Sequence, residues 1–339
     1  MWKPFYKLTP DLLFRIATIE RLYGQIEGLK IPQNLELNLT RQNMIQSSYA
    51  SNKIEGNPLT LPEVTNLLLD DRVPANRSEK EVVNYFDTLK KLPQWRNQPV
   101  SVEFVTSLHG KLLEGVDKTA GNIRNVKVVV GRTGNEGGNT TLRVKHDPPF
   151  HTREEISKQL DERIQWTQSD RDTHACIQAG IFHHEFVYIH PFEDGNGRIC
   201  RILTALILLK AGYQINRYFI LDDYYDIDRH QYSDMLHSAD TGDKTAWLQY
   251  FCDGIRYSLQ SALGRLKTAM RTLSIPNRPT KREQEVLTII DEQKELTSTD
   301  IAKKLSITRQ QAHNLLKSLV KKGFLERKGS TKSSYYILK

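Results

Sequence analysis

The chain has 339 residues and a formal net charge of +8, a length that allows two or three domains with a sizeable core. Its three cysteines have no paired or metal-type spacing, which excludes a disulfide scaffold and indicates a reducing compartment. No apolar run is long enough for a membrane span and the N-terminus lacks a signal-peptide pattern, so we expect a cytoplasmic protein without a membrane segment.

The first hundred residues are predicted to be mostly helical, because apolar residues recur at helical spacing over 10–28 and 39–53. The second helix closes with the sequence SNKIEGN, in which Ser51 and Glu55 are one turn apart on one face. Gly56 is expected to end the helix, so that the Glu55 carboxylate projects from its last turn. The residues alone leave open that Glu55 is a solvated helix-end side chain.

Two strand-like runs follow, at 125–130 and 142–146, with the glycine-rich segment GRTGNEGGNTT between them. This composition predicts a mobile β-hairpin with a long loop. A helix is then expected to begin near Thr173 and to carry His183 and His184. These two side chains point about 100° apart on a helix, and no third ligand is suitably spaced, so we do not predict zinc there.

The run HPFEDGNGRICR, residues 190–201, is the most informative segment of the chain. Gly195, Asn196 and Gly197 can point successive backbone amides into one concavity. The apolar run ILTALILL that follows predicts a helix whose N-terminus opens at that concavity, and helix N-termini bind anions.

The side chains of this run suit a nucleotide polyphosphate. Arg198 and Arg201 are three residues apart in the first turn of the helix, so both guanidinium groups can reach a phosphate chain. Asp194 supplies an oxygen ligand for a magnesium ion that also carries phosphate oxygens. The pKa of an ordinary histidine suits His190 to accept a proton near neutral pH.

This run resembles the motif of the Fic family, His-Pro-Phe-x-Asp/Glu-Gly-Asn-Gly-Arg-x-x-Arg, at every position. The resemblance implies transfer of AMP from ATP to a hydroxyl-bearing side chain of a protein, with pyrophosphate as the leaving group. It implies that His190 is the base, that Asp194 is the magnesium ligand and that Phe192 is an apolar anchor for the loop. The phosphates would then bind at the Gly195 to Gly197 nest and at Arg198.

A second resemblance involves the end of the predicted helix over 39–53. Many Fic proteins carry an inhibitory helix with the pattern Ser/Thr-x-x-x-Glu-Gly/Asn, which Ser51, Glu55 and Gly56 match. The resemblance implies that Glu55 pairs with Arg201 and occupies the space that a productive γ-phosphate needs. Since this pattern precedes the catalytic loop, the chain resembles the class with an N-terminal inhibitory helix.

The same resemblance assigns two further parts. The predicted hairpin would be a flap that binds the target peptide by main-chain pairing, although a structural hairpin without a substrate role remains the alternative. Residues 219–236 would close over the purine. The family often has adjacent tyrosines here, whereas Tyr232 is followed by Ser233 and a separate pair lies at 224–225; we predict Tyr232 as the purine wall.

The C-terminal part differs in charge from the rest of the chain. After the proline-containing stretch SIPNRPT at 274–280, residues 276–339 carry 14 Lys and Arg against 7 Asp and Glu. Helices followed by two strand-like runs are expected here, over 284–290, 298–305, 308–322, 324–327 and 335–338. This order resembles a winged helix-turn-helix.

If this unit binds duplex DNA, its third helix would enter the major groove. The side chains presented there would be Arg309, Gln310, His313, Asn314 and Lys317. Lys328 and Lys332 in the wing would contact the phosphate backbone of the DNA. The alternative is a protein-contact or dimerisation module whose lysines keep it soluble.

We therefore expect a mostly α-helical fold: a Fic-type helical bundle with a small hairpin flap, plus a winged-helix domain. The expected parts are a regulatory region over 1–100, a catalytic core over 101–273 and the winged helix over 280–339. The expected activity is Mg²⁺-dependent AMP transfer from ATP to Ser, Thr or Tyr of a target protein and of the enzyme itself. The alternative activities are removal of AMP from a modified protein and transfer of phosphate. A further alternative is a DNA-binding regulator whose Fic domain senses nucleotide. The sequence also leaves open whether the chain forms a homodimer.

Overall fold

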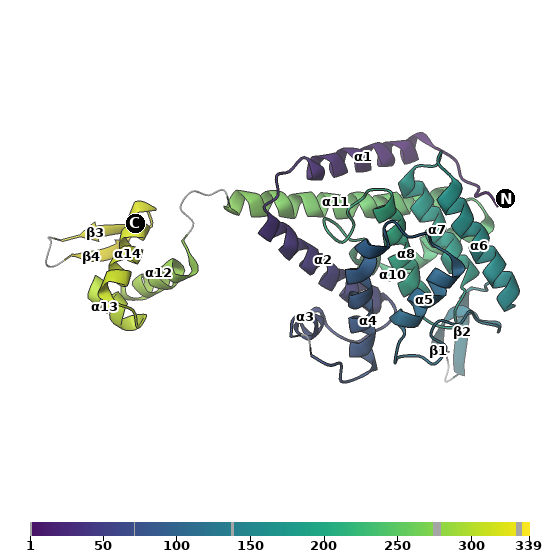
Figure 1. Cartoon of the computed structure of the whole chain (residues 1–339), viewed down its shortest axis with the longest axis horizontal. Coiled ribbons are helices and arrows are strands. Elements are labelled where there is room, and N and C mark those ends of the chain that lie inside the picture. Colours follow the sequence, from purple (N-terminus) through teal and green to yellow (C-terminus); the bar gives the residue numbers. More distant parts are fainter. Residues whose placement is uncertain (1, 71, 137–138, 274–278, 330–333) are drawn as a thin grey trace. The chain divides into compact units, whose positions relative to one another are not determined.

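The computed structural model describes residues 2–70, 72–136, 139–273, 279–329 and 334–339. The chain forms two compact units, Met1–Gly264 and Arg265–Lys339. Most described residues are helical and two small hairpins complete the structure (Figure 1), which confirms the predicted fold class. The finer division of the first unit near residue 100 stays a prediction.

The helices that begin in the first unit are α1 (Pro10–Glu27), α2 (Gln33–Ile54), α3 (Leu61–Leu69), α4 (Arg77–Lys91), α5 (Val102–Leu112), α6 (Arg153–Ser169), α7 (Ala175–Ile189), α8 (Asn196–Lys210), α9 (Asp222–Ile227), α10 (Arg229–Ser238) and α11 (Thr245–Leu273). The short 3-10 turns η1 (Leu92–Trp95) and η2 (Ala239–Thr241) join some of them. Among the described residues, no helix combines the length and apolar character needed to cross a membrane.

Helices α7 and α8 form the centre of the first unit, and nearly all of their residues are buried. They pack against each other. Gly180 of α7 allows close approach of α11, because a Cβ at this position would lie 2.8 Å from Leu248 and 3.0 Å from Phe251. Trp247 of α11 donates a hydrogen bond of 2.7 Å to the Gly180 carbonyl. The loop that joins α7 and α8, residues 190–195, is therefore anchored at both ends in the core.

Helix α2 packs against α4, α8 and α9. Its buried face near its C-terminal end is polar and includes Ser47, Ser48, Ser51 and Asn52. Buried polar groups in proteins usually have hydrogen-bond partners. Ser47, for example, donates a hydrogen bond of 2.6 Å to Asp222 of α9. The end of α2 is thus attached to the core beside α8 by polar contacts.

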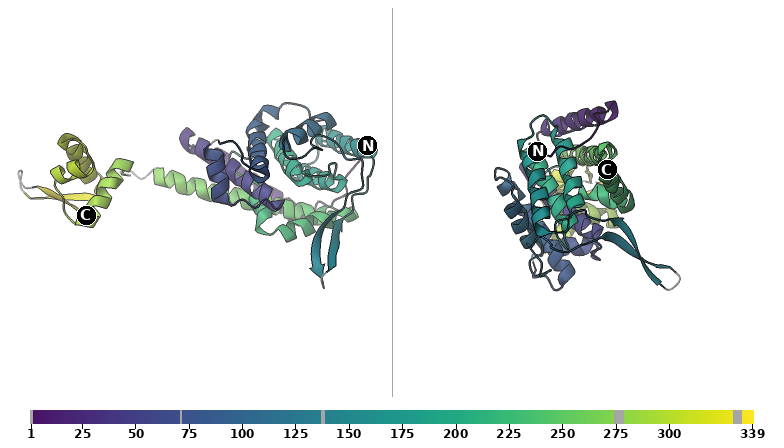
Figure 2. Two further views of the ribbon diagram at one scale, coloured as in Figure 1. Left: turned by 90° about the horizontal axis from the view of Figure 1, so that it is seen from below. Right: turned by 90° about the vertical axis from the view of Figure 1, so that its right-hand side faces the viewer.

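The hairpin consists of β1 (Val130–Glu136) and β2 (Asn139–His146), which pair antiparallel and project from the helices (Figure 2). The predicted first strand at 125–130 was therefore wrong: only Val130 of that run belongs to β1. Val126 and Val129 are 49% and 42% exposed, so these valines do not face a core. Backbone pairing instead continues through the glycine-rich segment as far as Glu136 opposite Asn139. Residues 137–138 at its tip lie outside the described residues.

The second unit contains α12 (Lys281–Gln293), α13 (Ser298–Lys304), α14 (Arg309–Lys321), β3 (Leu325–Lys328) and β4 (Tyr335–Leu338). A capping box starts each of these helices, at Thr280, Thr297 and Thr308. The buried core includes Val286, Ile290, Ile301, Leu316 and Leu319. This confirms the winged-helix-like arrangement. Residues 274–278 of the predicted linker at 274–280 and the wing residues 330–333, including Lys332, lie outside the described residues.

Candidate active site

The loop between α7 and α8 has an unusual backbone at both ends. His190 caps α7 in the left-handed region, at φ 51° and ψ 64°. Gly195 caps the start of α8 at φ 76° and ψ 2°. A left-handed histidine is uncommon and needs support from its surroundings.

Arg124 supplies that support. Its buried guanidinium group donates to the carbonyls of His190 (2.6 Å), Ile189 (3.1 Å), Val126 (2.8 Å) and Phe150 (2.7 Å). Its backbone amide donates to the Pro191 carbonyl at 3.0 Å. Burial lowers the pKa of Arg124. Our sequence analysis did not identify this residue, because a single arginine before the hairpin carries no recognisable pattern.

A second set of contacts closes the loop. The Asn196 side chain accepts from the Phe192 amide at 2.9 Å and donates to the Phe192 carbonyl at 2.8 Å. The buried Phe192 ring stacks on His109, with centroids 3.7 Å apart. Phe192 therefore lies where an anchor of the loop would be needed.

His109 of α5 is another residue that the sequence analysis missed. The Gly121 amide donates to its Nδ1 at 2.9 Å, so the proton of the neutral ring lies on Nε2, which faces the Asp194 carbonyl at 3.0 Å. Burial lowers the pKa of His109, which favours this neutral form. The ring thus connects α5 to the backbone of the loop.

The N-terminus of α8 is an anion-type site. Gly195, Asn196 and Gly197 begin the helix there, where backbone amides have no partner within the helix. Arg198 is buried, and its guanidinium lies 3.3 Å from the Asp194 carboxylate and 3.4 Å from Glu81 of α4. The structure therefore brings the predicted nest, arginine and carboxylate into one cluster.

Arg201, one turn further along α8, contacts the end of α2. Its Nη2 donates to Glu55 Oε1 at 2.7 Å and to the Ser51 carbonyl at 2.9 Å. Its Nε donates to the Ser51 hydroxyl at 2.7 Å. Gly56 follows with φ 91°, a conformation that suits glycine and turns the chain away after Glu55.

The Glu55 carboxylate also lies directly over Gly197. A Cβ at Gly197 would collide with Glu55 Oε1 and lie 3.0 Å from Arg201 Nη1. The carboxylate is thus an internal anion at the first turn of α8.

Asp222 of α9 is a second acidic neighbour of Arg201, with Oδ1 at 3.5 Å from Nε. It accepts hydrogen bonds from Ser47 at 2.6 Å and from the Tyr85 hydroxyl at 3.2 Å. Burial raises the pKa of Asp222, while the charge of Arg201 opposes this shift. The sequence analysis did not identify Asp222, which lies far from both short motifs along the chain.

Tyr232 of α10 lies in a buried aromatic cluster. Its ring stacks on Tyr225 with centroids 4.4 Å apart, and its hydroxyl lies 2.8 Å from Nε2 of His183. The Arg201 guanidinium is close enough to oppose the rise that burial causes in the pKa of Tyr232. Tyr224 instead contacts Tyr250 and Tyr257. The purine contact of Tyr232 stays a prediction.

The environment of His190 favours a neutral ring. Burial lowers the pKa of His190 to about 4, and the nearby rings of His146 and His237 act in the same direction. A neutral imidazole can accept a proton at pH 7.

The residues present also fit a magnesium ion. The Asp194 side chain is 43% exposed, and it lies beside the nest and the Arg198 guanidinium. Mg²⁺ commonly binds one or two carboxylates together with substrate phosphates, which is the donor set that this position offers.

The fold is a helical bundle in which His190 ends α7 and the buried Arg198 and Arg201 lie near the N-terminus of α8. Residues 99–208 match the Fic/DOC family and residues 282–333 match the MarR family. The chain therefore contains a Fic/DOC family domain and a C-terminal MarR-type winged-helix region.

Curated relatives are distantly similar. Protein adenylyltransferase Fic of Nematostella vectensis is 28% identical over 222 residues, covering 62% of this chain and 46% of the relative. Protein adenylyltransferase fic-1 of Caenorhabditis elegans is 27% identical over 241 residues, which cover 68% of this chain and 43% of the relative. The chain thus spans less than half the length of these relatives.

Solved structures share the fold. A Fic family protein from Desulfovibrio desulfuricans is similar over 100% of this chain and 98% of its own, with a TM-score of 0.78 and 25% identity. Fic-1 from C. elegans is similar over 76% of this chain and 73% of its own, with a TM-score of 0.61 and 22% identity.

Proposed function

We propose that the chain is a protein adenylyltransferase that transfers AMP from ATP to a hydroxyl side chain of a protein. The observation that carries this proposal is the short loop before α8 together with the start of α8. It combines a neutral His190, the Asp194 carboxylate and an amide nest with two buried arginines. The relatives named protein adenylyltransferases support the same activity.

The proposed reaction follows from the properties of these residues. The nest and Arg198 would bind the phosphates of ATP and orient the α-phosphorus toward the hydroxyl. The hydroxyl oxygen attacks that phosphorus, His190 accepts the hydroxyl proton, and the bond to the β-phosphate oxygen breaks to release pyrophosphate. A magnesium ion bound by Asp194 would offset negative charge on the phosphates.

We also propose that the resting chain inhibits itself. Glu55 pairs with Arg201 and lies over Gly197, so its carboxylate competes with a phosphate for the same donors. The Ser51 hydroxyl and carbonyl both accept from the same guanidinium, which aligns the end of α2 with α8. Displacing α2 or removing Glu55 would free Arg201 for the γ-phosphate.

The hairpin is the proposed binding edge for the target. Its strands pair with each other, and a two-stranded hairpin leaves outer backbone groups to pair with an extended peptide. Such main-chain pairing positions a hydroxyl group of the target and depends little on the amino-acid sequence of the target. Tyr232 is the proposed wall of the purine pocket.

Incubation with α-labelled ATP, magnesium and a cell lysate tests the transferase. Label on protein in the native sample, and its loss in a His190→Ala sample, is the expected result. Label transferred only from γ-labelled ATP would instead indicate a phosphotransferase. Release of AMP from a modified protein would indicate hydrolysis of the ester between AMP and the protein.

A second proposed function is binding of duplex DNA by the winged-helix unit. The MarR family match supports it. Five exposed side chains of α14 also support it, namely Arg309, Gln310, His313, Asn314 and Lys317. Arginine, asparagine and glutamine read base edges in the major groove. Sequence-specific retardation of a DNA fragment that survives loss of His190 would show that the unit acts as a regulator independently of the transferase.

A further inference from the structure

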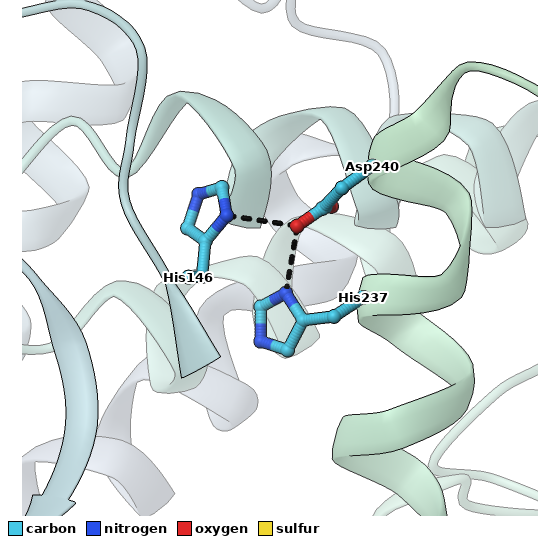
Figure 3. A group of neighbouring side chains, drawn as sticks. All are labelled: His146, His237 and Asp240. Carbon is cyan, nitrogen blue, oxygen red and sulfur yellow. Dashed lines mark hydrogen bonds and ion pairs between the residues drawn. The ribbon is translucent and has the colours of Figure 1, made fainter. Parts of the chain in front are cut away.

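Three side chains outside the motifs meet at the base of the hairpin. They are His146, the last residue of β2, His237 of α10 and Asp240 of η2 (Figure 3). Asp240 Oδ2 lies 2.8 Å from Nδ1 of His146 and 3.2 Å from Nδ1 of His237. One ligand atom from each residue lies within 4.8 Å of the others. Three elements therefore direct their donor atoms to one point.

The hydrogen bonds of His146 constrain what can occupy that point. Its Nε2 lies 2.9 Å from the Tyr188 carbonyl, and a carbonyl oxygen can only accept, so Nε2 carries a proton. In the neutral ring, the lone pair of Nδ1 would then face the Asp240 carboxylate at 2.8 Å. Two electron pairs repel each other at this distance unless a proton or another cation lies between them. The geometry therefore requires a cation.

Neighbouring hydrogen bonds orient the carboxylate in the same way. Lys244 donates to Nδ1 of His184 at 3.0 Å, so His184 donates through Nε2 to Asp240 Oδ1 at 2.9 Å. Lys244 is itself paired with Glu185 at 2.6 Å. This leaves Asp240 Oδ2 to the two histidines. Ligands of metal sites have such outer partners, which set the tautomer of each histidine and the direction of each carboxylate.

We propose that His146, His237 and Asp240 bind a divalent transition-metal ion of the zinc class. Two imidazole nitrogens and one carboxylate oxygen are a typical donor set for Zn²⁺, whereas Mg²⁺ prefers oxygen ligands alone. This site is therefore distinct from the magnesium position proposed at Asp194. Three protein ligands leave a fourth position for water or for a donor atom of a bound molecule. The His237 side chain is 15% exposed, which allows an ion to enter.

The ion would fix the base of the hairpin to the helices that follow the catalytic loop. A neighbouring contact already joins the same elements, since Lys145 of β2 donates to Ser233 and Asp234 of α10, at 3.1 Å in each case. The metal ligands would add a stronger link one residue further along β2. This inference does not depend on the transferase activity, because metal binding by these three side chains can be measured without any transfer of AMP.

Metal binding by the full chain tests the proposal directly. The native chain is stripped with a chelator, incubated with Zn²⁺, passed over a desalting column and analysed for bound metal. Calorimetric titration then measures affinity, and Co²⁺ replaces Zn²⁺ to report coordination by its absorption spectrum. We expect one ion per chain and the intense visible bands of four-coordinate cobalt. His237→Ala and Asp240→Asn should each weaken binding at least about tenfold.

A matched control separates this cluster from other histidines. His151 is exposed and lies outside the cluster, so His151→Ala should bind zinc as the native chain does. Circular dichroism of each metal-free variant checks that it is folded, and Asp240→Asn retains the shape of the side chain it replaces. Equal zinc affinity in the His237→Ala and His151→Ala chains would overturn the proposal. Absence of zinc binding to the native chain would also overturn it and would leave a proton as the cation between His146 and Asp240.

Discussion

Replacing Glu55 with glycine should activate the enzyme. The carboxylate of Glu55 accepts a hydrogen bond of 2.7 Å from Arg201 and lies over Gly197 at the start of α8. Glu55→Gly removes both the ion pair and the carboxylate that lies over Gly197. It leaves His190 and Asp194 in place, so the change is confined to the contact that we propose to be inhibitory.

The size of the effect follows from the strength of that contact. A hydrogen bond to a charged group contributes about 1.5–3 kcal/mol, and the 36% exposure of the Glu55 side chain places this one near the lower limit. Since each ~1.4 kcal/mol corresponds to a factor of ten, the rate should rise at least about tenfold. Removal of the carboxylate from above Gly197 should increase the rate further.

The assay is the rate of label transfer from α-labelled ATP to lysate proteins and to the chain itself. Glu55→Gln retains most of the volume over Gly197 but loses the charge, so it should give a smaller increase. Glu36→Gly is the matched control: Glu36 lies in the first turn of the same helix and pairs with Arg217 at 2.6 Å. This variant removes an ion pair at the other end of α2 and should leave the rate unchanged.

Two results would refute the reasoning. An unchanged rate in Glu55→Gly, with activity still lost in His190→Ala, would mean that something other than this helix regulates the transferase. An equal increase in Glu36→Gly would mean that loosening α2 activates the chain without any specific role of the ion pair. Arg201→Ala should not activate, because it removes a phosphate donor together with the pair.

Other predictions concern the base, the metal and the second unit. His190→Ala should lower the transfer rate by ~10² to 10⁴ while calorimetry still detects ATP binding; near-native turnover would exclude His190 as the base. Because burial lowers the pKa of His190 to about 4, the neutral base persists in mild acid, so kcat/KM should stay level from about pH 7 to about pH 5 and fall toward about pH 4. A decline centred near the ordinary histidine pKa of about 6.5 would contradict this. Asp194→Ala should weaken magnesium binding and activity together, whereas full activity in chelator would argue against a metal. A chain truncated after Leu273 should keep its transfer activity and lose any affinity for duplex DNA; in the full chain that affinity should decrease steeply with salt, and salt-independent binding would argue for a structural module.

The parts of the site that lie close together in sequence could be predicted from it. Residues 190–201 form one loop and the first turn of α8, so their order along the chain largely determines their order in space. Ser51 in the last turn of α2 and Glu55 at its C-cap are only four residues apart, so their proximity could be predicted for the same reason. In the second unit, each helix start carries its own capping box, a signal that is also local.

Contacts between distant residues could not be predicted in this way. Arg124 lies 66 residues before His190, and it binds backbone carbonyls, which every residue type offers. His109 and Asp222 likewise act through partners on other elements. The His146–Asp240 pair joins residues that are 94 positions apart. No periodicity or spacing along one chain indicates such contacts.

The hairpin boundaries were mispredicted for a related reason. Alternation of apolar and polar residues indicates a strand when one face packs on a core. Val126 and Val129 are exposed instead, and β1 begins only at Val130. Pairing between β1 and β2 uses backbone groups, and a glycine-rich segment has the same backbone groups as any other segment. The glycine-rich segment could therefore form part of β1 although its composition predicted a loop.

The position of Asp222 explains how the ion pair between Glu55 and Arg201 can be broken without unfolding the core. A buried charge that loses its only partner destabilises a protein by about 3–5 kcal/mol, and the Arg201 side chain is only 2% exposed. Arg201 keeps a second carboxylate, because Asp222 lies 3.5 Å from Nε and is itself bound by Ser47 and Tyr85. When Glu55 leaves, the guanidinium therefore remains charge-compensated on the core side and can direct its Nη2 donor to a phosphate.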